Sequence, residues 1–213
     1  RASALDGFRK LWRTACEIRQ HRDAALFLVA YFLYIDGVGT ILMMAAPISV
    51  DIGIPQGWLL LTILALQFLA FPFTILYGAL AKQYGARKML YAAIGVYILI
   101  AVLVGLIPLF DTPGAKRALF LTAAFLIGTS QGGIQSLSRS FFTRLIPAGQ
   151  AAEFFGFYNI FGKFTTILGP LLVGLAGWLF GYSEIGIALL GMPFLLGGFP
   201  LGKVRLPAER KGR

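Results

Sequence analysis

The chain has 213 residues and a net charge of +10, and 58% of its residues are hydrophobic while 13% are charged. A soluble domain carries about 25% charged residues, so this composition excludes a water-soluble globule and predicts a protein embedded in the lipid bilayer. The basic residues lie in short segments between apolar runs, a pattern of membrane topology rather than of nucleic-acid binding, so we expect no nucleic-acid partner.

The first 23 residues are polar and basic. Leu5, Phe8, Leu11 and Trp12 recur at helical spacing, with Lys and Arg between them. This pattern is typical of an amphipathic helix that lies on a membrane surface. We therefore predict a cytoplasmic amphipathic linker over residues 1–23. Because the chain begins with Arg and no signal peptide precedes the first apolar run, we also expect it to be part of a longer protein.

Six apolar segments follow, and each is close to the ~20 residues that a helix needs to cross the hydrocarbon layer. Gly128 and Gly132, four residues apart in the fourth segment, predict a close contact with a neighbouring helix. The predicted fold class is an all-α membrane protein, with a six-helix transmembrane bundle over residues 24–203 and a basic cytoplasmic tail over residues 204–213. We place the helices at residues 24–44, 58–78, 89–110, 118–138, 154–179 and 185–202.

Lys and Arg gather in alternate connections between these segments. Of the 19 in the chain, most lie in the first 23 residues, in the connections after the second and fourth segments, and in the tail. The positive-inside rule places this basic side in the cytoplasm. Both ends of the chain are then cytoplasmic, as an even number of spans requires.

Two ionisable residues lie inside predicted spans. Counted at about 1.5 Å per residue, Asp36 in the first span is ~18 Å and Lys163 in the fifth is ~15 Å from the cytoplasmic face, near the middle of the ~30 Å hydrocarbon layer. Charged side chains at that depth are costly and are usually paired. Two interpretations stay open: a static ion pair that joins the two helices, or a substrate or proton pathway lined by one or both residues.

Uncharged polar residues accompany these charges. Asn159 comes four residues before Lys163 and shares its helix face, while Gln131 and Gln135 form a similar stripe on the fourth segment. Polar stripes on two helices predict a hydrated cavity, although the same side chains also join membrane helices by hydrogen bonds. We therefore place all four in the candidate pathway.

Arg139 and Glu153 stand at the inner ends of the fourth and fifth segments. They form a second candidate pair, which is either a structural or gating contact or a solvated loop pair that contributes little. The chain has no metalloprotease, nucleophile-elbow or nucleotide-binding motif, and its single cysteine, Cys16, excludes a site with several thiolate ligands. We predict neither an enzyme nor a bound metal or cofactor.

The connection between the second and third segments resembles the loop signature of major facilitator superfamily transporters, G-x-x-x-D-R-x-G-R-R. In this chain it reads GALAKQYGARK over residues 78–88. Gly78, Gly85 and Arg87 match the signature, whereas Lys82 stands in place of its Asp. By this resemblance the matching residues belong to a gating loop that lacks its usual carboxylate.

Three longer blocks resemble the vacuole effluxer-like family of that superfamily, which is related to a yeast vacuolar amino acid exporter of autophagy. They read YFLYIDGVGTI at 31–41, SQGGIQSLSRSFFTRLIP at 130–147 and EFFGFYNIFGKFTTILGPLL at 153–172. The resemblance implies a twelve-helix transporter of which this chain is the C-terminal six-helix half, with a missing N-terminal six-helix half as its partner. It also implies that Asp36, Gln131 and Gln135 face the central cavity, and that Lys163 lies near the interface between the halves.

By the same resemblance, the expected function is that of a secondary active transporter that moves a small solute by alternating access, in a bacterial inner membrane. Amino acids are the leading substrates, and protons are candidate coupling ions through Asp36. Lys163 is either the counter-charge of Asp36 or an anchor for a substrate carboxylate, while Gln131, Gln135 and Asn159 supply hydrogen bonds. The alternative is a non-transporting membrane scaffold or receptor that has kept the transporter fold.

Overall fold

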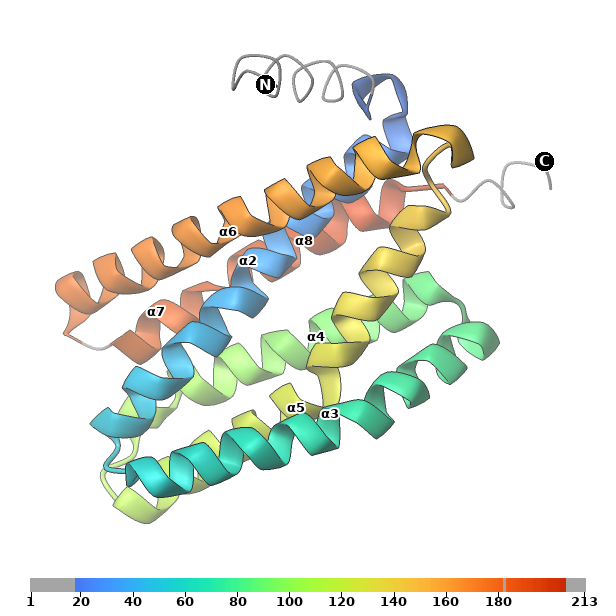
Figure 1. The fold of residues 1–213 in the computed structure, drawn as a ribbon. Helices are drawn as coiled ribbons and strands as arrows, with labels where there is room; N and C mark the ends of the chain where they lie inside the picture. Colours follow the sequence, from blue (N-terminus) through green and yellow to red (C-terminus); the bar gives the residue numbers. More distant parts are fainter. Residues whose placement is uncertain (1–17, 182, 206–213) are drawn as a thin grey trace, which may run out of the picture.

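The structure is a computed structural model in which residues 18–181 and 183–205 are described. Within these ranges the chain forms α-helices and two short 3-10 helices, and no strand occurs there. Most of the predicted linker and tail, residues 1–17 and 206–213, lies outside the described residues. The elements are α2 (Arg22–Asp51), α3 (Gln56–Tyr84), α4 (Ala86–Gly105), η1 (Ile107–Leu109), α5 (Pro113–Thr143), η2 (Ala148–Gln150), α6 (Ala151–Phe180), α7 (Ser183–Leu189) and α8 (Gly191–Lys203) (Figure 1).

The predicted segments fall on helices. Each of the first five lies on one main helix, and the third continues from α4 into η1. The sixth falls on α7 and α8, which are separated by a turn at Leu190, and Gly186–Lys203 together forms the predicted span. At the break, the backbone N–H of Leu190 bonds to the carbonyl of Ile187 in a tight turn. Pro193 explains the interruption, because its ring would clash with the carbonyl four residues earlier in a continuous helix.

Four helical stretches are long and apolar enough to cross a membrane: Arg22–Asp51, Gln56–Tyr84, Ala86–Leu109 and Gly186–Lys203. The described residues therefore show an all-α, multi-pass membrane protein with four of the six predicted spans.

The remaining two predicted spans correspond to α5 and α6, which contain 31 and 30 residues. α5 is less apolar because its second half carries Gln131 and Gln135. α6 contributes a shorter apolar stretch, Gly169–Leu179. Both helices therefore have the length of a span.

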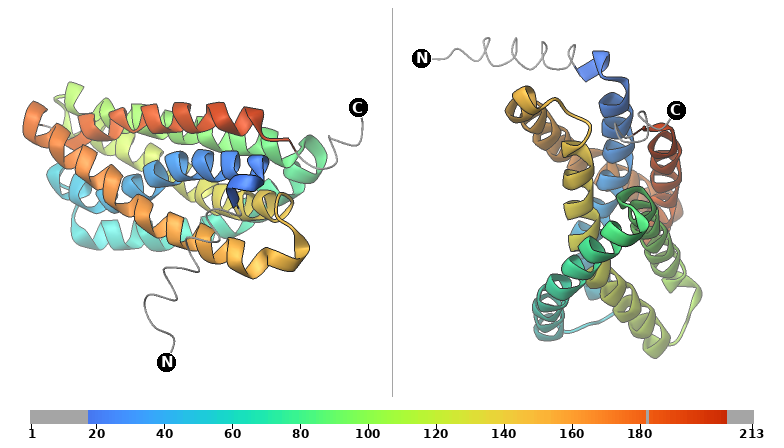
Figure 2. Two further views of the ribbon diagram at one scale, coloured as in Figure 1. Left: turned by 90° about the horizontal axis from the view of Figure 1, so that it is seen from above. Right: turned by 90° about the vertical axis from the view of Figure 1, so that its right-hand side faces the viewer.

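α2 runs through the middle of the bundle. Seen from above, it lies between α6 and α8 (Figure 2), and it packs against both of them as well as against α5. α4 packs on α5, α7 and α8, while α3 packs mainly on α5. In Figure 1, α6 follows the upper edge of the molecule and α3 follows the lower edge. A polar side chain on the inner side of α2 therefore meets another helix rather than lipid.

Aromatic rings fill the core where α2, α5 and α6 meet. Phe27 of α2 stacks on Phe141 of α5, with ring centroids 5.1 Å apart. Tyr31 of α2 and Phe142 of α5 both stack on Tyr158 of α6, at 4.1 and 5.1 Å. All five rings are buried. Stacked pairs contribute about 0.5–1.5 kcal/mol each beyond area burial, so this cluster holds the beginnings of α2 and α6 against the end of α5.

α2 and α8 approach each other closely through a glycine on each helix. A Cβ added to Gly37 of α2 would lie 2.7 Å from the ring of Phe194 in α8. A Cβ added to Gly197 of α8 would lie 3.0 Å from the backbone carbonyl oxygen of Ala30 in α2. Small residues permit such contacts between membrane helices, where close packing is a main source of association.

Alanine in place of Gly197 is expected to destabilise the protein, because the added methyl group meets backbone that cannot rotate away. Overpacking of this kind costs about 1–3 kcal/mol. Thermal unfolding of the full-length protein in detergent measures the change. Gly95→Ala in α4 is the matched control, since nothing lies within 4 Å of a Cβ at that position. Equal unfolding midpoints for the two variants would contradict the close packing of α2 on α8.

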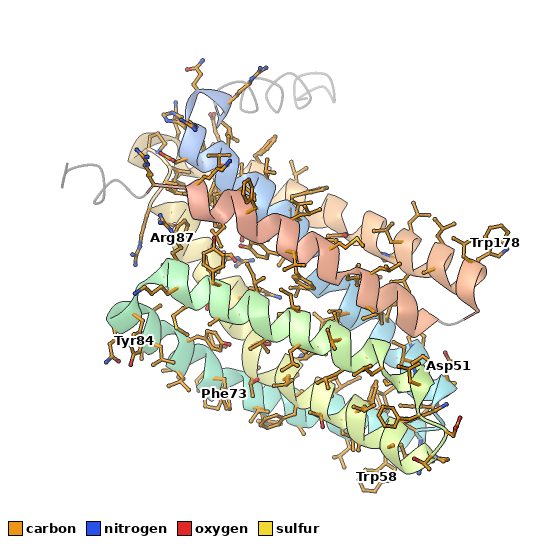
Figure 3. All side chains as sticks on the ribbon, turned by 180° about the vertical axis from the view of Figure 1, so that it is seen from behind. Asp51, Trp58, Phe73, Tyr84, Arg87 and Trp178 are labelled. Atoms are coloured by element: carbon orange, nitrogen blue, oxygen red, sulfur yellow. The ribbon has the colours of Figure 1, made fainter. Side chains whose placement is uncertain are left out.

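α3 differs from the other long helices because none of its residues is buried. Trp58 at its start is exposed and points away from the bundle (Figure 3). On its inner side α3 rests on glycines of α5: a Cβ added to Gly128 would lie 2.7 Å from Leu66, and one added to Gly132 would overlap Thr74. The close helix contact predicted from this glycine pair is confirmed.

The two ends of the bundle differ in their exposed side chains. Figure 3 shows Trp58 of α3 and Trp178 of α6 at one end, and Tyr84 and Arg87 at the other. Both tryptophans are exposed. Trp and Tyr are enriched where a membrane protein meets the headgroup layer, so this arrangement agrees with helix axes that run across a bilayer.

Candidate functional site

A cavity of about 450 Å³ lies between α2, α5 and α6. This volume is within the ~300–1,000 Å³ range of small-molecule sites. Helical periodicity explains the lining, because residues three, four and seven apart share one helix face. The lining residues are Tyr31, Ile35, Val38, Gly39 and Leu42 of α2, Gln135 and Arg139 of α5, and Tyr158, Asn159, Gly162 and Lys163 of α6.

Four of the polar residues singled out from the sequence meet at this cavity. Gln135 and Arg139 lie one turn apart on α5, and Asn159 and Lys163 lie one turn apart on α6. All four side chains are exposed. The wall that α2 contributes is apolar apart from the Tyr31 hydroxyl. The cavity is therefore amphipathic, with its charges on two of its three helices.

Asp36 and Gln131 do not line this cavity. The Asp36 side chain is 4% exposed, and its Oδ1 accepts a hydrogen bond of 3.1 Å from the backbone N–H of Gly169 in α6. Gln131 is half-buried on α5, one turn before Gln135. The structure thus joins the Asp36 carboxylate to the backbone of α6, and its pairing with Lys163 stays a prediction.

α2 and α6 approach closely at this hydrogen bond. A Cβ added to Gly169 would overlap the Thr40 side chain and would lie 3.1 Å from the Asp36 carboxylate. The Thr40 hydroxyl donates a hydrogen bond of 2.8 Å to the backbone carbonyl of Asp36, one turn earlier in α2. Pro170, the next residue of α6, has no N–H to donate. Asp36 therefore accepts a hydrogen bond from α6 at the residue directly before a proline.

Tyr31 and Tyr158 are cavity residues that sequence reasoning missed. Tyr158 is 1% exposed with its hydroxyl buried, and its ring stacks on that of Tyr31 at 4.1 Å. The Tyr34 hydroxyl, also buried, lies 2.6 Å from Ser138 Oγ of α5. A tyrosine within an apolar span needs a polar partner for its hydroxyl, so Tyr31 and Tyr158 could have been added to the candidate site from the sequence.

The loop residues of the superfamily signature lie at the end of the bundle marked by Arg87 in Figure 3. Gly85 joins α3 to α4 with a φ of +94°, which side chains with a Cβ rarely adopt. Arg87 donates a hydrogen bond to the carbonyl oxygen of Val204, just after α8. Gly78 lies half-buried in the later part of α3. In this structure the loop therefore ties the start of α4 to the end of α8.

Arg139 and Glu153 occupy different environments. Arg139 lines the cavity, whereas Glu153 is exposed in the first turn of α6 and is not a lining residue. A gating contact between them stays a prediction. Over residues 18–181 and 183–205, no group of three or more His, Cys, Asp or Glu side chains is placed to hold a metal ion.

The chain is similar to proteins of known family. Residues 2–201 match the family model described as vacuole effluxer Atg22 like. An uncharacterized MFS-type transporter of Bacillus subtilis, YxiO, is 43% identical over 193 residues, covering 91% of this chain and 44% of that protein. Autophagy-related protein 22 of Yarrowia lipolytica is 34% identical over 179 residues, covering 79% of this chain and 29% of that protein. The protein of the same name from Vanderwaltozyma polyspora is 30% identical over 179 residues, covering 79% of this chain and 34% of that protein.

The chain spans less than half the length of these curated relatives. No solved structure matches it.

Proposed function

The chain belongs to the vacuole effluxer Atg22 like family, and from this premise we propose that it is half of a secondary active transporter that moves a small solute by alternating access. The observation that supports this most directly is the cavity of about 450 Å³ between α2, α5 and α6. It combines an apolar wall with a few convergent polar groups, as small-molecule sites generally do. The similarity to an MFS-type transporter of Bacillus subtilis points the same way.

The other half is an N-terminal six-helix bundle that packs on this one. Two observations support this partner. The relatives are more than twice as long as the segment that they share with the chain. In addition, α3 buries none of its residues against the described helices, so a large apolar surface is available for lipid and for a second bundle. Transporters of this architecture rock two bundles around a site near the bilayer midplane.

Both ends of the chain lie in the cytoplasm of this proposed protein, and the membrane is a bacterial inner membrane. The positive-inside rule supports the orientation, because Arg22, Lys88, Arg144 and Arg205 all lie at helix ends on the same side as Arg87. The 43% identity to a bacterial protein supports the location.

Amino acids are the proposed substrates and protons the proposed coupling ions. The cavity offers the amides of Gln135 and Asn159 for hydrogen bonds and Lys163 as a fixed charge. Asp36, buried at the contact of α2 and α6, is a carboxylate within a span that can bind and release a proton.

Flux measurements on the full-length protein in lipid vesicles test the proposed function. We expect uptake of at least one of the 20 amino acids above that of protein-free vesicles, with a dependence on an imposed proton gradient. Absence of flux for every amino acid, with the protein shown to be folded, would support the scaffold or receptor alternative instead.

A further inference from the structure

A second pocket, of about 160 Å³, lies at one end of the bundle, and its lining shares no described residue with the cavity between α2, α5 and α6. It forms where the start of α2, the end of α5 and the end of α8 come together (Figure 1). We call it the end pocket. Its lining residues are Gln20, His21, Arg22, Asp23 and Ala24 around the start of α2, Leu145 after α5, and Arg205 after α8.

Hydrogen bonds hold the segment after α8 against two other helices at this pocket. The backbone N–H of Arg205 donates a hydrogen bond of 3.0 Å to Oδ1 of Asp23 in the first turn of α2. One residue earlier, the carbonyl oxygen of Val204 accepts a hydrogen bond from Arg87 in the first turn of α4. Because residue 205 is held through its backbone, its side chain is not needed for this link.

The end pocket and its surroundings are rich in cations. Arg22 and Arg205 are exposed lining residues, and Asp23 is the one acid among the described residues of the lining. Glu153 is exposed in the first turn of α6 and does not line the pocket. Three further cations are chain neighbours of lining residues or bond beside one: Arg19, Arg144 and Arg87. A concave site surrounded by an excess of positive charge attracts anions.

The length of α2 places the end pocket at the depth of lipid headgroups. α2 has 30 residues, or about 45 Å at ~1.5 Å per residue, which matches the ~40–45 Å thickness of a bilayer with its headgroup layers. Arg22, the first residue of this helix, therefore lies in a headgroup layer, and the bond to Asp23 keeps residue 205 at the same depth. Basic pockets between membrane helices are known to bind anionic headgroups at the cytoplasmic surface.

From this charge and depth we propose that the end pocket binds the phosphate group of an anionic phospholipid through the guanidinium groups of Arg22 and Arg205. A guanidinium forms two parallel hydrogen bonds with phosphate oxygens, and the side chains of Gln20 and His21 supply further N–H donors. A phospholipid with a choline headgroup is disfavoured, because its ammonium group meets the cations that surround the pocket. This site is separate from the proposed transport cavity.

Lipid binding to the full-length protein in detergent tests the proposal. The probes are phosphatidylglycerol and phosphatidylcholine with the same acyl chains, and bound lipid is measured by native mass spectrometry. We expect phosphatidylglycerol to bind about tenfold more tightly, a factor within reach of one charge-assisted hydrogen bond. We also expect it to raise the thermal unfolding midpoint more than phosphatidylcholine does, because a ligand of the native state stabilises that state.

A pair of double variants locates the site. Arg22→Gln with Arg205→Gln is expected to remove the preference for phosphatidylglycerol, while the backbone bond from residue 205 to Asp23 persists. Lys82→Gln with Lys88→Gln is the matched control, because it removes two exposed cations at the same end that do not line the pocket. We expect the control to keep the preference. Thermal unfolding without added lipid shows whether each variant is folded, and Arg22→Gln alone, expected to lose part of the preference, decides the question if the double variant does not fold.

Three results would overturn the proposal: equal binding of the two lipids, an unchanged preference in the arginine variants, or an equal loss in the lysine control, which would mean attraction by surface charge alone. Glycerol 3-phosphate separates a lipid site from a site for a soluble anion. If it raises the unfolding midpoint as much as phosphatidylglycerol does, the pocket binds soluble phosphates and the lipid proposal is wrong. Amino acid flux is a separate measurement, so failure of this proposal leaves the proposed transport function standing.

Discussion

Asparagine in place of Asp36 is expected to reduce transport by the full-length protein to the level of protein-free vesicles, while the protein stays folded in the membrane. The amide oxygen of Asn can still accept the hydrogen bond from Gly169, so the link between α2 and α6 persists. What is lost is a carboxylate that binds and releases a proton inside a span. Gly169 is six residues beyond Lys163, or about 9 Å along α6, so this proton site would lie beside the cavity.

The control for this variant is Asp51→Asn, the same change at the exposed last residue of α2. Initial flux under an imposed proton gradient and the amount of folded protein are measured for both variants. We expect full transport in Asp51→Asn. Full transport in Asp36→Asn would show that the charge of Asp36 is not used, and that the residue serves as a structural link between α2 and α6.

Leucine in place of Gly169 is expected to separate α2 from α6 and to abolish both the stable fold and the cavity between them. A Cβ at this position overlaps Thr40, and the rest of a leucine side chain has to displace α2 itself. Overpacking costs about 1–3 kcal/mol and occasionally more, and a clash with a neighbouring helix axis belongs at the upper end. The hydrogen bond to Asp36 is lost with the close contact, which leaves a buried carboxylate without its donor.

Gly174→Leu is the matched control on the same helix, because nothing lies within 4 Å of a Cβ there. Thermal unfolding and size-exclusion chromatography of the full-length variants report the difference. A Gly169→Leu protein as stable as Gly174→Leu would refute the close approach of α2 and α6.

The sequence predicts the helices well and their membrane character less well. A run of about 20 apolar residues can be recognised as a helix from its composition alone, so the main helices fall where predicted. The turn before Gly191 was not placed, because hydropathy does not register the backbone clash that Pro193 causes. α5 is less apolar than the other long helices because it carries polar side chains such as Gln131 and Gln135.

The candidate site was predicted in part, because spacing tells which residues share a helix face but not how that face is turned toward its neighbours. Gln135 therefore reaches the cavity, while Gln131, one turn away, does not. The depth of Asp36 could be counted along the helix. Its partner could not be predicted, because the backbone N–H of Gly169 has no side chain to signal it.

Because no residue of α3 is buried, this helix can enter the membrane before it packs on α5. α3 leaves the ribosome before α5, the helix on which it later rests. None of its residues is buried, and it is long and apolar enough to cross a membrane, so it can remain alone in lipid until residues 113–143 have been made. Insertion and docking are then separate steps. Bulky substitutions at Gly128 or Gly132 should leave the first step intact and arrest the second, producing a protein that is inserted but not assembled.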